Sequence, residues 1–227
     1  MKRRTIASIF ILAMTLLSSC NKKEIRSDIA EFIASFSVES AVEAYKKVEM
    51  TKTIKVDNLG DKTYTLETIN FDVSDPYNPI YHDHSETYKN DVLSETNDTY
   101  FKIENEEYFI VINEVEYEYT LEKCHDIIRQ FFYKRVILDG TYHEPGYYYG
   151  DMVKGSIYEY QNHMEIDQEK KFLTFSYCYN QKAGSGEDVK RCSKFILDEF
   201  GMLNYNLASD TAIGKSVETE IIIEKKL

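Results

Sequence analysis

Two histidines, His82 and His84, are separated by one residue and carry the side chains best suited to bind a metal ion. In a β-strand, residues two apart point to the same side, so both imidazoles could ligate one ion while Asp83 faces away. A third ligand would have to come from elsewhere, and His143 and Glu86 are the candidates. The alternative is a pair of solvated histidines on an exposed strand. Because no second His or Cys pair occurs at ligand spacing, the sequence predicts neither a bound metal nor a cofactor.

An aromatic cluster in the middle of the chain is a candidate for binding. Tyr147, Tyr148 and Tyr149 are consecutive, and Tyr142 lies shortly before them. Tyrosine offers a large amphipathic ring with little rotamer entropy to lose, which suits contacts with ligands and with proteins. The alternative is that the triplet reflects composition alone, because the chain contains 19 tyrosines.

Motifs of catalysis are missing from the sequence. It has no Gly-x-Ser-x-Gly nucleophile, no glycine-rich phosphate loop and no His-Glu-x-x-His pattern. Cys124 and His125 are adjacent, but neighbours on a helix diverge by about 100° and rarely cooperate. No carboxylate pair stands out either, since the chain has 39 acidic residues. The sequence therefore predicts a protein that binds and is not an enzyme.

Cys178 and Cys192 lie at equal distances along the chain on either side of Ser185. A hairpin that turns there satisfies three pairings in one register: Cys178 with Cys192, Phe175 with Phe195, and Leu173 with Leu197. The cysteines would share one face of the hairpin and the apolar pairs the other. We therefore expect a cross-strand disulfide, which stabilises by about 3 kcal/mol in the chain-entropy model. Two reduced thiols are the alternative. Cys124 is expected to be a small buried apolar residue.

Helices and antiparallel strands must position these residues. Apolar residues recur at three- and four-residue spacing in two segments, which predicts helices over about 28–48 and Leu121 to Leu138. The first is expected to bend or split near Ser37 and Ser40. Elsewhere the period is two, which predicts strands. These are expected at Thr51–Val56, Tyr64–Ile69, Tyr81–Tyr88, Thr99–Glu104, Glu107–Ile112, Val115–Thr120, Met152–Tyr160, Lys171–Tyr179, Lys190–Leu197, Met202–Leu207 and Val217–Glu224.

Periodicity also predicts which side chains face the core. In the hairpin after residue 106 we expect one buried face and a wetted face that carries Glu114, Glu116 and Glu118. The buried face would consist of Tyr108, Ile110, Ile112, Val115, Tyr117 and Tyr119. In the second helix the inward residues would be Leu121, Cys124, Ile128, Phe131, Phe132 and Leu138.

This order of elements predicts an α+β fold, in which a curved antiparallel sheet packs on two main helices within a single domain over 28–227. A two-sheet sandwich is the competing fold. The element order, with the late strand–turn–strand from Phe195 to Leu203, is similar to that of the LolA/LppX-like group of bacterial lipoproteins and lipoprotein carriers. The resemblance implies an unclosed barrel over the helices and an apolar cavity for a lipid or other amphiphile. No motif carries a functional residue over from that group.

The first twenty residues have the pattern of an export signal. Lys2, Arg3 and Arg4 precede an apolar run, and Leu17-Ser18-Ser19-Cys20 follows it. This end resembles the lipobox of bacterial lipoproteins. The resemblance implies that residues 1–19 are a signal peptide and that Cys20 is acylated and becomes the first mature residue. Residues 20–27 would then be the lipidated cysteine and a short tether, which holds the domain at the extracytoplasmic face of the cell membrane.

Net charge narrows the range of partners. The chain carries a formal charge of −12, which argues against nucleic acid because phosphate binding needs clustered Lys and Arg. The sequence thus predicts a membrane-anchored lipoprotein whose partners are the bilayer, through Cys20, and an amphiphilic ligand in a non-catalytic binding domain. The alternative is a cell-surface accessory protein that binds a protein partner through its acidic or tyrosine-rich surface.

Overall fold

The structure is a computed structural model that describes residues 26–135, 161–182 and 186–226 of the chain. Its helices are α2 (Ser27–Ile33), α3 (Val38–Ala44) and α4 (Leu121–Tyr133), with a short 3₁₀ helix at Gln161–His163. Its strands are β1 (Lys47–Asn58), β2 (Asp61–Asp72), β3 (Ile80–Lys89), β4 (Val92–Glu104), β5 (Glu107–Ile112), β6 (Val115–Tyr119), β7 (Met164–Asp167), β8 (Phe172–Lys182), β9 (Asp188–Leu197), β10 (Leu203–Ala212) and β11 (Lys215–Lys226).

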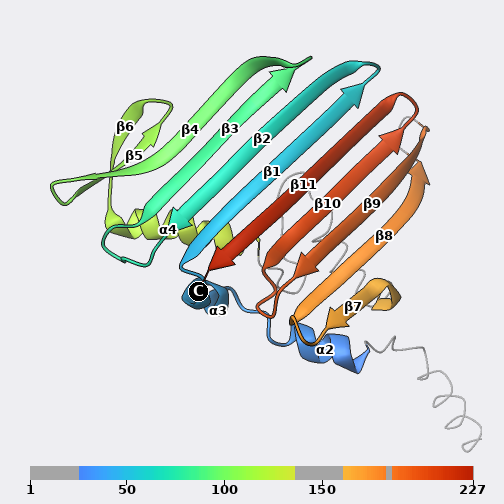
Figure 1. Cartoon of the computed structure of the whole chain (residues 1–227), viewed down its shortest axis with the longest axis horizontal. Helices are drawn as coiled ribbons and strands as arrows, with labels where there is room; N and C mark the ends of the chain where they lie inside the picture. The colour runs from blue at the N-terminus through green and yellow to red at the C-terminus, as the bar shows by residue number, and fades with distance from the viewer. Residues whose placement is uncertain (1–25, 136–160, 183–185, 227) are drawn as a thin grey trace, which may run out of the picture.

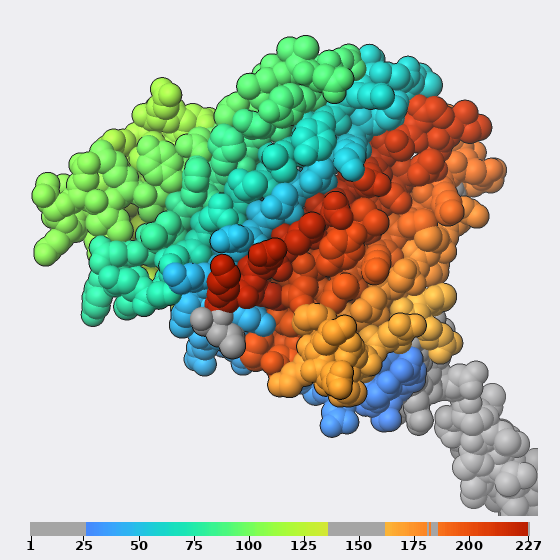
Figure 2. Space-filling view, viewed as in Figure 1, coloured from blue at the N-terminus to red at the C-terminus, as the bar shows by residue number. Residues whose placement is uncertain are grey.

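The described strands form one antiparallel sheet in the order β6-β5-β4-β3-β2-β1-β11-β10-β9-β8-β7. Two meanders, β1 to β6 and β7 to β11, are joined where β1 pairs with β11. The helices lie behind the lower ends of the strands (Figure 1). We call the face that they cover the inner face, and the opposite one, which Figure 2 shows, the outer face. The expected α+β fold with a curved, unclosed antiparallel sheet is confirmed.

The core lies between the helices and the lower half of the inner face. Phe71 of β2 packs edge-on against Phe131 and Phe132 of α4, with ring centroids 5.1 and 5.6 Å apart. Each such ring stabilises the folded state by about 1.5–3 kcal/mol when it is fully buried. The buried cluster consists of Ile29, Val38, Ala41, Val48, Met50, Ile69, Phe71, Ile128, Phe131, Phe132, Met164, Leu173, Phe175, Phe195, Leu197, Met202, Leu203, Ile221 and Ile223.

The first predicted helix is two helices, α2 and α3. Ser37 starts α3 because its hydroxyl oxygen accepts a hydrogen bond from the Ser40 N–H at 3.2 Å, which satisfies a free donor of the first turn. The prediction that this helix reaches Val48 is wrong. β1 already starts at Lys47, where its backbone pairs with both β2 and β11, and Val48 is a buried strand residue.

Helix α4 begins as predicted at Leu121, where the Thr120 side chain accepts the Lys123 N–H at 3.2 Å. It ends at Tyr133, short of the predicted Leu138, which lies outside the described residues. The inward positions predicted for its middle are confirmed, since Cys124, Ile128, Phe131 and Phe132 are all buried.

The outermost hairpin, β5–β6, corrects the predicted burial. Ile112, Val115 and Tyr117 were expected in the core, yet they are 41%, 51% and 51% exposed. The two strands pair with Ile110 opposite Tyr117. However, β6 is an edge of the described sheet, and the hairpin projects beyond the helices (Figure 1). Alternation alone therefore does not show which residues of this hairpin are buried, because Val111, on the opposite side of β5 from Ile112, is only 2% exposed.

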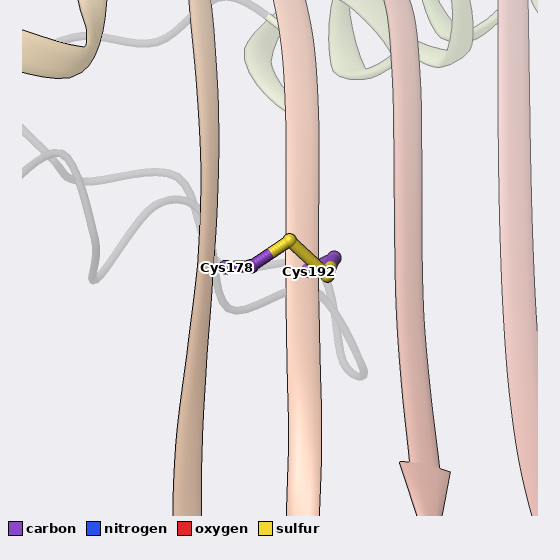
Figure 3. The surroundings of a disulfide bond; sticks show 2 residues. All are labelled: Cys178 and Cys192. Carbon is purple, nitrogen blue, oxygen red and sulfur yellow. A yellow bond between two sulfur atoms is a disulfide. The ribbon is translucent and has the colours of Figure 1, made fainter.

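Strands β8 and β9 pair in the predicted register. Cys178 lies opposite Cys192, and Phe175 lies opposite Phe195. The two sulfur atoms are 2.13 Å apart and form a disulfide that bridges the strands (Figure 3). The two Phe rings stack on the inner face with centroids 4.8 Å apart. One register therefore places the sulfurs and the aromatic pair on opposite faces.

The turn between β9 and β10 ties the helices to the sheet. The Ser37 N–H donates to the Phe200 carbonyl at 3.1 Å. Gly201 closes the turn with a φ of 78°, a conformation that favours glycine. A Cβ there would lie 2.5 Å from the Phe36 ring. This close approach fixes how the α2–α3 link sits on the sheet.

Candidate functional site

A cavity of about 530 Å³ lies between α4 and the inner face of β2 and β3. Its size is within the range of about 300–1,000 Å³ typical of small-molecule sites. The lining residues come from four elements: Glu67 and Ile69 of β2, Tyr81 and Asp83 of β3, Tyr119 of β6, and Lys123, Asp126, Ile127, Gln130, Phe131, Lys134 and Arg135 in and just after α4.

Helix α4 supplies one wall of this cavity because of its periodicity. Lys123, Ile127, Gln130 and Lys134 recur at three- and four-residue spacing, so they form one stripe along the helix. That stripe adjoins the buried stripe of Cys124, Ile128 and Phe132 that packs on the sheet. The same helix therefore anchors itself in the core and lines the cavity.

The apolar part of the cavity is continuous with the core. Ile69 and Phe131 are each 5% exposed and belong to the core. Tyr81 stacks on Phe101 of β4 with ring centroids 5.0 Å apart. Side chains held this firmly can form a preformed apolar surface for a ligand.

Two carboxylates of the sheet line the cavity, Glu67 from β2 and Asp83 from β3. Glu67 pairs with Lys52 of β1 at 2.9 Å, and both side chains are largely buried. Asp83 accepts a hydrogen bond from the Tyr81 hydroxyl at 3.4 Å. Burial raises the pKa of Asp83, and the charge of Glu67 raises it further. Burial also raises the pKa of Tyr81.

Cationic groups occupy the α4 side of the cavity. Arg135 is only 3% exposed, and its guanidinium lies 4.2 Å from the Phe131 ring centroid, with Nε 3.1 Å from the Met50 sulfur. The ammonium group of Lys123 lies 5.3 Å from the Tyr119 ring centroid. In the described part of the chain, neither Lys123 nor Lys134 is in an ion pair.

The lining of this cavity is therefore mixed. The sequence resemblance implies an apolar cavity, whereas this cavity is lined by charged as well as apolar side chains. Such a lining fits a molecule with both an apolar and a polar part.

The histidine pair lies on the outer face, where Asp98 of β4 joins it. Asp98 Oδ1 lies 2.6 Å from His82 Nε2 and 3.0 Å from His84 Nδ1. As predicted, Asp83 points to the other face, where it lines the cavity. The hydrogen bond with His82 is the largest cause that lowers the pKa of Asp98, and the bond with Asp98 raises the pKa of His84.

Asp98 is the ligand-type residue that the sequence analysis missed. The predicted strand began at Thr99, but β4 starts at Val92 and pairs with β3 over most of its length. Of the two third ligands proposed, Glu86 Oε1 lies 3.6 Å from His84 Nε2, and His143 lies outside the described residues. The signal that could have found Asp98 is the register of the β3–β4 hairpin, which places it directly opposite His84.

The remaining predicted site residues lie outside the described ranges. They are Cys20, Tyr142, Tyr147, Tyr148 and Tyr149. Of the described residues, Cys124 is the free cysteine, and burial raises its pKa to about 11. It would be almost wholly protonated at neutral pH and is not a candidate nucleophile. No helix among the described residues is long and apolar enough to cross a membrane.

Comparisons with known proteins find weak likenesses of overall structure. No family model matches the chain, and no curated protein sequence matches it. LprF from Mycobacterium bovis is 9% identical, with a TM-score of 0.28 over 87% of this chain and 93% of that chain. A putative outer membrane lipoprotein-sorting protein domain from Vibrio parahaemolyticus is 12% identical, with a TM-score of 0.23 over 87% and 90%.

A third solved structure, a β-barrel-like protein of the domain of unknown function DUF1849 from Brucella abortus, is 8% identical. Its TM-score is 0.18 over 81% of this chain and 99% of that chain. At such identities and TM-scores, these likenesses assign no family to the chain.

Proposed function

We propose that this protein is a lipid-anchored extracytoplasmic lipoprotein whose domain binds an amphiphilic small molecule in the cavity between α4 and the sheet. One observation carries the proposal: a 530 Å³ cavity in which a fixed apolar patch adjoins cationic side chains. The apolar part of the ligand would lie against Ile69, Tyr81 and Phe131. Burial of each methylene group there contributes about 0.8 kcal/mol.

The cationic groups in and just after α4 are the ones suited to an anionic end of the ligand, whereas Glu67 and Asp83 of the sheet are not. Glu67 is compensated by Lys52 at 2.9 Å, and Asp126 lies 4.0 Å from Arg129. Lys123 and Lys134 have no such partner in the described residues. Together with the buried Arg135 they make the α4 side cationic. Carboxylate and phosphate groups are bound by such side chains through charge-assisted hydrogen bonds.

The test is a titration of unlipidated protein, residues 20–227 carrying Cys20→Ser, with a fluorescent long-chain fatty acid. Wild-type protein should bind the probe, and Lys134→Glu should raise Kd about tenfold, which is a loss of about 1.4 kcal/mol. Lys215→Glu is the matched control, because it makes the same charge change at an exposed lysine of β11 that does not line the cavity. Equal Kd values for the two variants, or no binding by wild type, would reject the proposed site.

The proposed anchor is Cys20, with residues 1–19 as the signal peptide, 20–27 as the tether and 28–227 as the folded domain. Two buried acyl chains suffice for stable membrane attachment at about 0.8 kcal/mol per methylene. The Cys178–Cys192 bridge supports an extracytoplasmic location, because disulfides persist in oxidising compartments.

The anchor is tested by cell fractionation of a Cys20→Ala variant. This variant should leave the membrane fraction and should incorporate no labelled fatty acid. Cys124→Ala is the control, since it removes a buried cysteine of the domain and should stay at the membrane. Retention of Cys20→Ala with its lipid label intact would contradict acylation at this residue.

A further inference from the structure

We propose that His82, His84 and Asp98 form a binding site for one divalent transition-metal ion of the Zn²⁺ type on the outer face. One nitrogen of each imidazole and one carboxylate oxygen lie within 4.8 Å of one another. Two imidazoles and a carboxylate are ligands that Zn²⁺ prefers. The site is separate from the cavity, because the intervening Asp83 points to the opposite face of β3.

Strand pairing brings the three side chains together. His84 lies directly opposite Asp98 in the β3–β4 register, and His82 lies two residues along the same strand. Side chains two apart on a strand, and those opposite each other on neighbouring strands, share one face of the sheet. All three therefore project from the same patch of backbone, whatever rotamers they adopt.

The ligand atoms are close to the spacing that a metal requires. Asp98 Oδ1 lies 2.6 Å from His82 Nε2 and 3.0 Å from His84 Nδ1. In a tetrahedral site with bonds of about 2.0–2.2 Å, the ligand atoms are about 3.3–3.5 Å apart. A small outward rotation of these partly exposed side chains would admit the ion. Water from the exposed side would complete the coordination.

Neighbouring groups contact two of the three ligands, Asp98 and His84. The Asp98 N–H donates to Asn113 Oδ1 at 2.8 Å, and the Asn113 N–H donates to the Asp98 carbonyl at 2.8 Å. Glu86 Oε1 lies 3.6 Å from His84 Nε2 and accepts the Tyr88 hydroxyl at 2.7 Å. A carboxylate beside the second nitrogen of a ligating histidine is the usual outer-shell partner in zinc sites.

The contrasting explanation is that Asp98 simply joins two imidazoles by hydrogen bonds and holds no metal. To separate the two, full-length protein purified from membranes in detergent is stripped with chelator and titrated with Zn²⁺ by calorimetry and with Co²⁺ by absorbance. We expect one ion per chain. His84→Ala and Asp98→Asn should each weaken binding at least tenfold, whereas His125→Ala, on α4, should bind as wild type does.

A variant that is less stable than wild type could bind less zinc simply because part of it is unfolded. The melting temperature of each variant is therefore measured with and without Zn²⁺. Ligands that bind only the folded state raise Tm, so zinc should raise the Tm of wild type and of His125→Ala. The same addition should leave His84→Ala and Asp98→Asn unshifted relative to their own metal-free samples. The proposal is overturned if wild type takes up no ion, or if His84→Ala and Asp98→Asn bind as tightly as wild type.

Discussion

At the scale of single residues, the Asp198 carboxylate joins three elements at one buried point. It pairs with Lys225 of β11, and the two side chains are only 6% and 7% exposed. The Tyr45 hydroxyl donates to Asp198 Oδ2 at 2.7 Å, and the Met202 N–H donates to Oδ1 at 2.9 Å. Burial lowers the pKa of Lys225, although the charge of Asp198 opposes that shift. Such a buried pair is stable only because its hydrogen-bonding groups are satisfied.

Replacement of Asp198 by Asn should therefore destabilise the protein strongly. Loss of the carboxylate charge leaves the Lys225 ammonium buried without its counter-charge, which costs about 3–5 kcal/mol. The free energy of unfolding in urea measures the effect. Asp188→Asn is the control, because its pair with Lys182 is 81% and 74% exposed and should contribute little. Equal losses in the two variants would contradict this role of Asp198.

Asp72 at the end of β2 should make stability depend on pH in the acid range. A hydrogen bond from Lys47 is the largest cause that lowers its pKa to about 2, and the Ser74 N–H adds to the effect. A depressed pKa means that the stabilisation is fully present above the unfolded value near 3.8 and is lost as the pH falls toward 2.

An Asp72→Asn variant isolates this contribution. It should be slightly less stable than wild type at neutral pH, and the difference should shrink between pH 4 and about 2, the folded-state pKa of Asp72. Urea unfolding at a series of pH values gives both curves. Parallel curves over this range would show that Asp72 has no depressed pKa in the folded state.

At the scale of elements, the disulfide fixes the β8–β9 hairpin. Cys178 and Cys192 are separated by 14 residues, and a loop of that size corresponds to about 3 kcal/mol in the chain-entropy model. The variant with both cysteines replaced by Ser should lose about that much stability. Reductant should lower the stability of wild type to the same level and leave the double variant unchanged.

Intact mass provides the direct readout for the disulfide. Reduction should add two hydrogens, about 2 Da, to wild type, and none to the double variant. An unchanged wild-type mass after reduction would show that the thiols are not joined in the isolated protein.

The periodicity of apolar residues predicted most of the described helices and strands, because it is a strong local signal of both. Alternation predicted the bounds of β5, and the symmetry about Ser185 predicted the register of β8 and β9. The first half of β4 was missed because Ser94, Glu95 and Asn97 have low strand propensity, and pairing with β3 overrides that preference. The end of the first helix was misplaced for the same reason, since Val48 fits a helical period but pairs in β1.

At the scale of the whole molecule, the candidate sites depend on tertiary arrangement that periodicity does not contain. The cavity draws residues from β2, β3, β6 and α4, and only the placement of α4 across the sheet brings them together. His82 and His84 were identified as a pair from their spacing. Their partner Asp98 follows only from the β3–β4 register. Sequence can therefore predict ligand-type residues along one strand, but not the partner that another strand supplies.

The two faces of the sheet have different roles in this account. The inner face holds the core and, beside it, the cavity proposed to bind an amphiphile. The outer face carries the His82–His84–Asp98 cluster and the disulfide between Cys178 and Cys192 (Figure 3). Attachment through Cys20 would hold both faces close to the membrane, because the proposed tether is only a few residues long.

Native mass spectrometry of protein with a filled cavity tests the central claim most directly. Ile127→Trp places a large ring on the α4 wall of the 530 Å³ cavity, whereas Arg129→Trp places it on α4 outside the cavity. Wild type and Arg129→Trp, both unlipidated, should carry a co-purified amphiphile that Ile127→Trp lacks. If Ile127→Trp retains the same ligand at the same occupancy, or if wild type carries none and takes up no fatty acid, the cavity is not a binding site.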